Sequence, residues 1–370
     1  MWLKNLSVFN FKNYDQANLG FVPEVNVFAG NNGSGKTNLL DAIHYLSLCK
    51  SYFNPIDSQQ IKQGADWFMV QGDFEKDDIP YNIACSLKKN QKKLFKKDKK
   101  EYQRLADHIG LFPLVMISPA DTGIVMEGSE ERRKFMDNVI SQTDARYLDR
   151  LIAYNRALQQ RNALLKQLGR SGMPDPHLME ALDAQLIDHG EEIFKKRQAF
   201  IEQFLPEFER HYLFLTDSAE LVKLKYESQL QEQSFAELLA SSFERDRIME
   251  RTTSGIHKDD MIFTIHDDLP LKRFGSQGQQ KSFLIALKLA QYTYFLEVKG
   301  FKPLLLLDDI FDKLDDLRVR KLMEMVSHDE FGQLFVTDTH ADRIRSIFEG
   351  IDTNIRFFDI DKGNATYEQD

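Results

Sequence analysis

The segment Gly30–Thr37, which reads GNNGSGKT, constrains the fold of this chain more than any other. It matches the pattern G-x-x-x-x-G-K-[ST] at every specified position, between an apolar run that ends at Ala29 and a helix-like stretch over Lys36–Leu48. Glycines in such a loop let backbone N–H groups turn towards phosphates at the positive end of a helix. The pattern predicts a nucleotide-binding α/β fold, whereas the simpler interpretation is a flexible glycine turn.

The loop residues have distinct expected roles. We expect Lys36 to offset the charge that develops on a γ-phosphate and the Thr37 hydroxyl to bind Mg²⁺. The residues expected to hold the nucleotide are Gly30, Asn31, Asn32, Gly33, Ser34, Gly35, Lys36 and Thr37.

A second segment supplies carboxylates. The apolar run Leu304–Leu307 predicts a buried strand that delivers Asp308 and Asp309 at its end. We expect Asp308 to hold Mg²⁺ and Asp309 to orient an attacking water. An ordinary acidic loop after an apolar strand is the alternative.

A third segment reads Ser276-Gln277-Gly278-Gln279 and precedes a predicted helix. Ser276 is a natural N-cap, and neighbouring backbone amides could bind an anion. The alternative is a capped helix start without a ligand.

The periodicity of apolar residues divides the chain into parts. Strand-like patterns fill the first part of the chain and return after Tyr212, whereas residues 129–211 show helical spacing. Gly169, Gly172, Pro174 and Pro176 predict a turn between two helices. We therefore expect an α/β head of residues 1–128 and 212–370, with a mixed sheet and flanking helices, interrupted by a helical arm domain of residues 129–211.

Composition limits the classes of protein. The chain of 370 residues carries 48 Lys and Arg against 57 Asp and Glu, a net charge of −9, and 42% of its residues are hydrophobic. This content argues against disorder, and the lack of a long apolar run argues against a membrane protein. The two cysteines, Cys49 and Cys85, favour a cytosolic protein without disulfides. The net acidity argues against a wholly basic nucleic-acid binder.

A glycine-rich phosphate loop, a Ser-x-Gly-Gln-Gln segment and a strand ending in two carboxylates, in this order, resemble ATP-binding-cassette (ABC) ATPases. Further segments resemble the SMC/Rad50/RecF group within these ATPases, and the RecF proteins in particular. These segments, which are spread over nearly the whole chain, are residues 6–14, 31–43, 118–121, 128–137, 255–260 and 308–315.

The resemblance implies an ABC-type ATPase head that forms ATP-dependent homodimers, in which Ser276–Gln279 contact the γ-phosphate bound by the partner copy. It also implies ATP and Mg²⁺ as cofactors, a slow DNA-stimulated ATPase, and binding to double-stranded DNA and to junctions of single and double strands. A RecF-type protein would act in the bacterial cytoplasm, at the nucleoid, in recombinational DNA repair. There it would help RecR and RecO to load RecA onto gapped single-stranded DNA.

Several positions refine the resemblance. Asp309 stands where most ABC ATPases have glutamate, which favours slow hydrolysis, and Lys258 stands where arginine is common, which removes bidentate hydrogen bonding. Asp315 matches an aspartate that touches the dimer partner in this superfamily. His340 is out of register with the histidine expected to sense the γ-phosphate, and a surface loop histidine is the alternative.

Basic residues suggest where DNA could bind. A tract between two predicted strands contains Lys88, Lys89, Lys92, Lys93, Lys96, Lys97, Lys99 and Lys100. A solvated hairpin face is the alternative to a DNA contact there. Weaker candidates for DNA contact are Arg132, Arg133, Arg156, Arg161 and Arg170.

Two other classes of protein contain the same kind of phosphate loop and are alternatives. The ATPase subunit of a membrane transporter would have a compact helical domain between its phosphate loop and its Ser-x-Gly-Gln segment. A monomeric phosphotransferase would need the phosphate loop alone.

Overall fold

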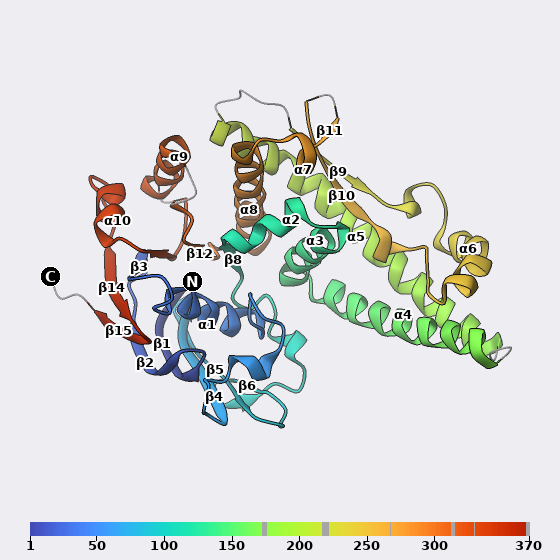
Figure 1. The fold of residues 1–370 in the computed structure, drawn as a ribbon, viewed down its shortest axis with the longest axis horizontal. Helices are drawn as coiled ribbons and strands as arrows, with labels where there is room; N and C mark the ends of the chain where they lie inside the picture. Colours follow the sequence, from blue (N-terminus) through green and yellow to red (C-terminus); the bar gives the residue numbers. More distant parts are fainter. Residues whose placement is uncertain (172–175, 217–221, 267, 312–314, 329, 368–370) are drawn as a thin grey trace. The chain divides into compact units, whose positions relative to one another are not determined.

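The computed structural model describes residues 1–171, 176–216, 222–266, 268–311, 315–328 and 330–367 (Figure 1). The chain forms two compact units, which we call the head unit and the arm unit. The head unit consists of Met1–Thr122, Arg210–Ser218 and Lys281–Asp370, and the arm unit of Gly123–Glu209 and Ala219–Gln280.

The head unit contains two six-stranded sheets. The first is antiparallel throughout, in the order β2-β1-β4-β5-β6-β7. The second has the order β15-β14-β3-β13-β12-β8 and is parallel except for its edge strand β15. The strands are β1 (Trp2–Phe11), β2 (Tyr14–Gly20), β3 (Val25–Ala29), β4 (Trp67–Lys76), β5 (Ile79–Lys88), β6 (Leu94–Lys97), β7 (Lys100–Glu101), β8 (Leu114–Ile117), β12 (Leu304–Asp308), β13 (Leu334–Asp338), β14 (Ile355–Asp361) and β15 (Asn364–Tyr367).

Helix α1 (Lys36–Leu48) contacts strands of both sheets and is buried along nearly its whole length. Its apolar side chains and those of the two sheets form one hydrophobic core, in which the rings of Phe28 and Phe335 stack. The hydrophobic core therefore fixes the position of α1 and of Lys36, its first residue. The other helices of this unit are α9 (Asp316–Ser327), α10 (Ala341–Phe348), most of α8 (Gln277–Lys299) and the 3-10 turns η1 (Asp57–Gln60), η2 (Leu105–Asp107) and η3 (Pro119–Asp121).

The arm unit combines helices with a small antiparallel sheet of order β11-β10-β9. Its elements are α2 (Thr122–Met126), α3 (Ser129–Thr143), α4 (Ala145–Ser171), α5 (Pro176–Thr216), β9 (Val222–Glu227), η4 (Gln229–Gln231), α6 (Phe235–Met249), η5 (Ile256–Lys258), β10 (Asp260–Ile265), β11 (Leu269–Pro270) and α7 (Leu271–Phe274). Helices α2, α5 and α8 each continue from one unit into the other.

The division of the chain differs from the expected one at a single large segment. We expected residues 212–370 to return to the head, but Ala219–Gln280 group with the helices of the arm unit. The reason is packing, since β10 contacts α3 and α6 contacts α4. Ser276–Gln279 therefore belong to the arm unit.

Most predicted elements are present, and several others were missed. The predicted helix over Lys36–Leu48 has the observed bounds, and the expected helical hairpin is α4 and α5, with α3 as a separate helix before it. Gly172 and Pro174, at which we predicted a turn, lie outside the described residues, as do positions 312–314 of the last RecF-like segment. The missed elements include α2, α6, α7, α10, β11, β14 and β15.

Within the part of the chain that the structure describes, no helix combines the length and the apolar character needed to cross a membrane.

Candidate functional site

The phosphate loop lies between the fully buried strand β3 and helix α1. Gly30 and Gly35 have φ values of 150° and 121°, which L side chains rarely adopt. A Cβ on Gly30 would lie 2.2 Å from the carbonyl oxygen of Ile360, and one on Gly35 would lie 2.5 Å from Asn13 Nδ2. Both positions therefore require glycine, because the φ values disfavour other residues and because Ile360 and Asn13 leave no room for a Cβ.

Two turns of the head unit brace this loop. Asn13 Nδ2 donates to the Ser34 carbonyl at 2.9 Å, and the Tyr14 hydroxyl donates to the Gly35 carbonyl at 3.1 Å. The N–H of Gly363, in the turn between β14 and β15, donates to Ser34 O at 3.0 Å. Sequence reasoning missed these positioning residues, because Asn13 and Tyr14 stood out only within a RecF-like segment.

Lys36 lies at the centre of the loop. Its Nζ donates to the carbonyl oxygens of Gly30 (2.6 Å) and Asn31 (2.9 Å). Burial lowers the pKa of Lys36, while the carboxylates of Asp309 and Asp308 act in the opposite direction. The loop thus concentrates an ammonium group and backbone N–H groups where a phosphate chain would lie.

Thr37 and Asp308, the two expected Mg²⁺ ligands, meet directly. Thr37 Oγ1 donates to Asp308 Oδ1 at 2.8 Å, and Thr337 Oγ1 donates to the same oxygen at 2.9 Å. Burial raises the pKa of Asp308, and these two hydrogen bonds partly offset that effect. A hydroxyl and one carboxylate fit Mg²⁺, which in nucleotide sites takes its remaining ligands from phosphates and water.

Asp309 has a different environment. Its φ of 49° places it in the left-handed region, and its N–H donates to Thr337 Oγ1 at 2.9 Å. Among the described residues, nothing forms a hydrogen bond with its buried Oδ1. Such an oxygen needs a polar partner, and a water held for attack on a phosphate fits this need.

The loop that follows β13 closes one side of the site. The His340 N–H donates to Asp338 Oδ1 at 2.7 Å, and Arg343 forms an ion pair with the same carboxylate. The His340 ring is exposed, and its Nδ1 lies 2.8 Å from Thr339 Oγ1. In this arrangement His340 is the N-cap residue of α10.

A cavity of about 370 Å³ lies beside the phosphate loop. The residues that line it are Ala29, Gly30, Asn31, Thr339, Ala341, Asp359, Ile360 and Asp361.

Ser276 caps α8 as predicted. Gln279 N–H donates to Ser276 Oγ at 3.1 Å, and Ser276 N–H donates to Gln279 Oε1 at 2.7 Å. This reciprocal capping holds Ser276–Gln279 in a defined conformation at an exposed helix start. Asp315 also caps its helix, α9, by accepting the Arg318 N–H at 3.0 Å.

The lysine tract is not uniformly available to DNA. Lys93 is half-buried, with its Nζ 2.8 Å from Asp57 Oδ2 and 2.6 Å from the Cys49 carbonyl oxygen. Lys89 pairs with Asp66 at 3.2 Å. A sequence pattern does not reveal which lysines have partners in the folded chain.

The arginines that we considered for DNA contact also differ in burial and in their hydrogen-bond partners. Arg161 was wrong as a DNA contact, because its side chain is fully buried between Asp183 and Asp246. Arg132 forms two hydrogen bonds with the Asp260 carboxylate, at 2.7 and 2.9 Å. Nothing is described of the Arg170 side chain.

Comparison with known proteins gives consistent matches. The family model described as RecF/RecN/SMC N terminal domain matches residues 2–365. A Flavobacterium johnsoniae protein named DNA replication and repair protein RecF is 49% identical over 360 residues, covering 97% of this chain and all of that protein. A protein of the same name from Bacteroides thetaiotaomicron is 47% identical over 365 residues, covering 98% of each chain.

Solved structures agree with these matches. One described as the recombination mediator protein RecF with ATP, in the RecFOR pathway, has a TM-score of 0.89 at 29% identity and covers 100% of this chain and 98% of its own. The Smc head domain of Pyrococcus furiosus has a TM-score of 0.58 at 16% identity, covering 99% of this chain and 96% of its own. The predicted ABC-type ATPase fold is confirmed.

Proposed function

The chain belongs to the RecF family, and on this basis we propose that it is an ATP-dependent DNA-binding protein of DNA replication and recombinational repair. The observation that carries the proposal is the contact between Thr37 and Asp308, since it joins the phosphate loop to the carboxylate strand. The similar solved structure described as RecF with ATP supports the choice of nucleotide.

Gly30–Thr37 hold the phosphates of ATP through backbone N–H groups, and Lys36 offsets the charge that develops on the γ-phosphate. Thr37 and Asp308 would hold Mg²⁺, which would supply positive charge to offset the charge of the phosphates. The unpartnered oxygen of Asp309 positions the attacking water. A short aspartate at this position makes hydrolysis slow.

Two copies of the chain associate when ATP is bound, and Ser276–Gln279 of each copy contact the γ-phosphate held by the other. The exposed and rigidly capped start of α8 supports this role. Slow, DNA-stimulated hydrolysis then limits the lifetime of the dimer on DNA.

The partners of this activity are double-stranded DNA, junctions of single and double strands, RecR and RecO, with RecA loading as the outcome. The description of the similar structure, which places RecF in the RecFOR pathway, supports RecR and RecO. The protein acts in the bacterial cytoplasm, at the nucleoid.

Substitution of Lys36 tests the proposal. Lys36→Ala removes the ammonium group from the loop, so we expect ATP-dependent dimerisation to be lost in sedimentation velocity runs. Lys62→Ala, which removes an ammonium group that pairs with Asp15 in the same unit, is the control and should dimerise normally. An unchanged dimer in the Lys36 variant would contradict the nucleotide assignment.

The two alternative functions are not favoured. The matches to RecF proteins cover nearly the whole chain, including the arm unit, which neither a transporter subunit nor a monomeric phosphotransferase would explain.

A further inference from the structure

Four basic side chains of the arm unit form what we call the cationic loop cluster: Arg133, Arg245, Arg251 and Lys258. Arg133 is half-buried on α3, whereas Arg245, near the end of α6, is exposed, as are Arg251 and Lys258. Arg251 and Lys258 lie in the segment that joins α6 to β10.

A buried carboxylate folds this segment back onto the helix. Asp246, which is fully buried, accepts hydrogen bonds on Oδ1 from the Thr253 N–H (2.7 Å) and hydroxyl (2.6 Å). The Arg251 N–H donates to the Asp246 carbonyl at 3.1 Å. The backbone of Arg251 is thereby held against the last turns of α6, the helix that carries Arg245.

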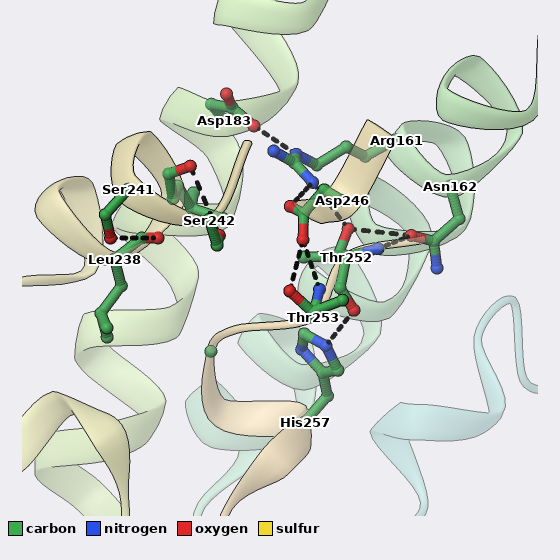
Figure 2. Close-up of polar contacts among 12 residues, drawn as sticks. Arg161, Asn162, Asp183, Leu238, Ser241, Ser242, Asp246, Thr252, Thr253 and His257 are labelled. Carbon is green, nitrogen blue, oxygen red and sulfur yellow. Dashed lines mark hydrogen bonds and ion pairs between the residues drawn. The ribbon is translucent and has the colours of Figure 1, made fainter. Parts of the chain in front are cut away.

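A buried arginine anchors the same segment to the helical hairpin (Figure 2). Arg161 Nη1 donates to Asp246 Oδ2 at 2.7 Å and to Thr252 Oγ1 at 2.9 Å, and its Nε donates to Asp183 Oδ1 at 2.5 Å. Asn162 Oδ1 accepts the Thr252 N–H at 2.7 Å. The positive charge of Arg161 is therefore neutralised inside the arm unit by Asp183 and Asp246.

Further hydrogen bonds fix the position of Lys258 through its two neighbours in the chain, His257 and Asp259. His257 Nε2 lies 3.1 Å from the Thr252 carbonyl oxygen, and His257 Nδ1 lies 2.8 Å from the Tyr154 hydroxyl. Arg133 Nη1 donates to the carbonyl oxygen of Asp259, the neighbour of Lys258, at 2.7 Å. The cluster is thus assembled by hydrogen bonds among its neighbours rather than by chance proximity of mobile side chains.

Within the described residues, none of the four members of the cluster forms an ion pair. The carboxylates close to them pair with other arginines: Asp246 with Arg161, Asp259 and Asp137 with Arg197, and Asp260 with Arg132. Partial burial and repulsion by Arg251, Arg133 and Arg245 lower the pKa of Lys258. On a chain with net charge −9, four neighbouring cations without ion pairs among the described residues are a local exception.

We propose that the cationic loop cluster binds the phosphate backbone of DNA. Exposed cations on a hydrogen-bonded backbone can displace counterions from DNA without a rearrangement of that backbone, and they read no bases. This inference rests on the proposed function and adds to it a specific surface of the arm unit.

The test uses the full chain with ATP and a fluorescein-labelled gapped duplex, with binding followed by anisotropy at several salt concentrations. The triple variant Arg245→Ala/Arg251→Ala/Lys258→Ala should bind more weakly. Its slope of log affinity against log salt should fall by about one for each phosphate that the variant no longer neutralises. Arg133 is left in place because it supports the Asp259 backbone.

The control is Lys134→Ala/Lys195→Ala/Arg247→Ala, which removes the same charge from exposed arm-unit residues that pair with glutamates. It should keep the wild-type slope, and Lys258→Arg should keep wild-type affinity. Equal slopes for the triple variant and wild type would overturn the inference and leave the proposed function standing. So would loss of poly-glutamate binding with DNA binding unchanged, since that result assigns the surface to an acidic protein segment. Failure of the wild type to bind DNA at all would overturn both.

Discussion

At the scale of single residues, burial decides the chemistry of the ionisable groups. Asp308 and Lys36 have pKa values shifted in opposite directions from their ordinary ones, and for both the main cause is loss of water. Burial therefore favours the neutral form of each group more than water would. A ligand with charges opposite to those of Lys36 and Asp308 would stabilise their charged forms.

The Asp309 side chain carries the first prediction. Asp309→Asn keeps the size of the side chain and removes the charge that would orient the water, so we expect ATP to bind but hydrolysis to fall by roughly 10²-fold. The dimer on DNA should then last longer, which stopped-flow mixing with competitor DNA measures. Asp359→Asn, at the wall of the adjacent cavity, is the control. Faster turnover in the Asp309 variant would contradict the assigned role.

His108 predicts a loss of stability in acid. Its Nε2 lies 2.7 Å from the Leu46 carbonyl oxygen and its Nδ1 lies 3.0 Å from the Tyr102 hydroxyl, so the neutral ring satisfies both partners. Burial lowers its pKa to about 4, below the unfolded value of about 6.5. The unfolded chain therefore binds a proton first as the pH falls, and stability is lost between about pH 6.5 and 4, by roughly 3 kcal/mol from this group.

Urea unfolding at several pH values checks this expectation. His108→Gln should be less stable than wild type at neutral pH, and its stability should fall less steeply over the same acid range. His177→Gln, which changes an exposed imidazole, should leave the wild-type slope unchanged. A His108 variant with the full wild-type slope would show that this group does not cause the loss.

At the scale of elements, one side chain ties the two sheets of the head unit together. Gln333, which precedes β13 and is buried, donates to the carbonyl oxygens of Leu3 (2.8 Å) and Val22 (2.8 Å). Its Oε1 accepts the Leu3 N–H at 2.7 Å. Both N–H groups and the oxygen of the amide are thus used between β1, the segment before β3, and β13.

Removal of this amide should be costly. Gln333→Leu removes the amide partner of the buried N–H and carbonyl oxygen of Leu3, and it leaves the Val22 carbonyl oxygen with the Asn26 Nδ2 hydrogen bond at 2.8 Å. We therefore expect a loss of about 3 kcal/mol in the free energy of unfolding. Thermal unfolding followed by circular dichroism measures the loss, with Gln91→Leu at an exposed turn as the control. An unchanged melting temperature in the Gln333 variant would exclude this role for the amide.

At the scale of the whole molecule, the proposed function requires two copies of the chain. The arm unit contributes the capped start of α8, whereas the phosphate loop and its carboxylates lie in the head unit. Helix α8 begins in the arm unit and continues in the head unit, so its capped start belongs to the same helix as residues of the head core.

Ser276→Arg should prevent ATP-dependent dimerisation and leave ATP binding intact, because the long side chain obstructs a contact made by the partner copy. Light scattering and binding of a fluorescent ATP analogue separate the two effects. The control is Ser234→Arg, which alters the same kind of reciprocal cap at the start of α6. Loss of ATP binding by the Ser276 variant would mean that this segment does not act from the partner copy.

The sequence alone determined the features that depend on near neighbours in the chain. The spacing of glycines before Lys36, the apolar run before Asp308 and the Ser276 cap each involve a few consecutive residues, so local geometry follows from residue type. Helix α6 was missed although Ser234 and Glu237 form a capping box at its start, which is a local signal that the prediction did not use.

Only the tertiary structure decided features that join residues distant in the chain. It placed Thr37 against Asp308, grouped Ala219–Gln280 with the arm unit, and buried Arg161 while leaving Arg245 without an ion pair among the described residues. A positive charge looks the same in the sequence whether a carboxylate from another element neutralises it or not. The availability of that charge is set by packing and by the cost of burying ions, and both exist only once the chain has folded.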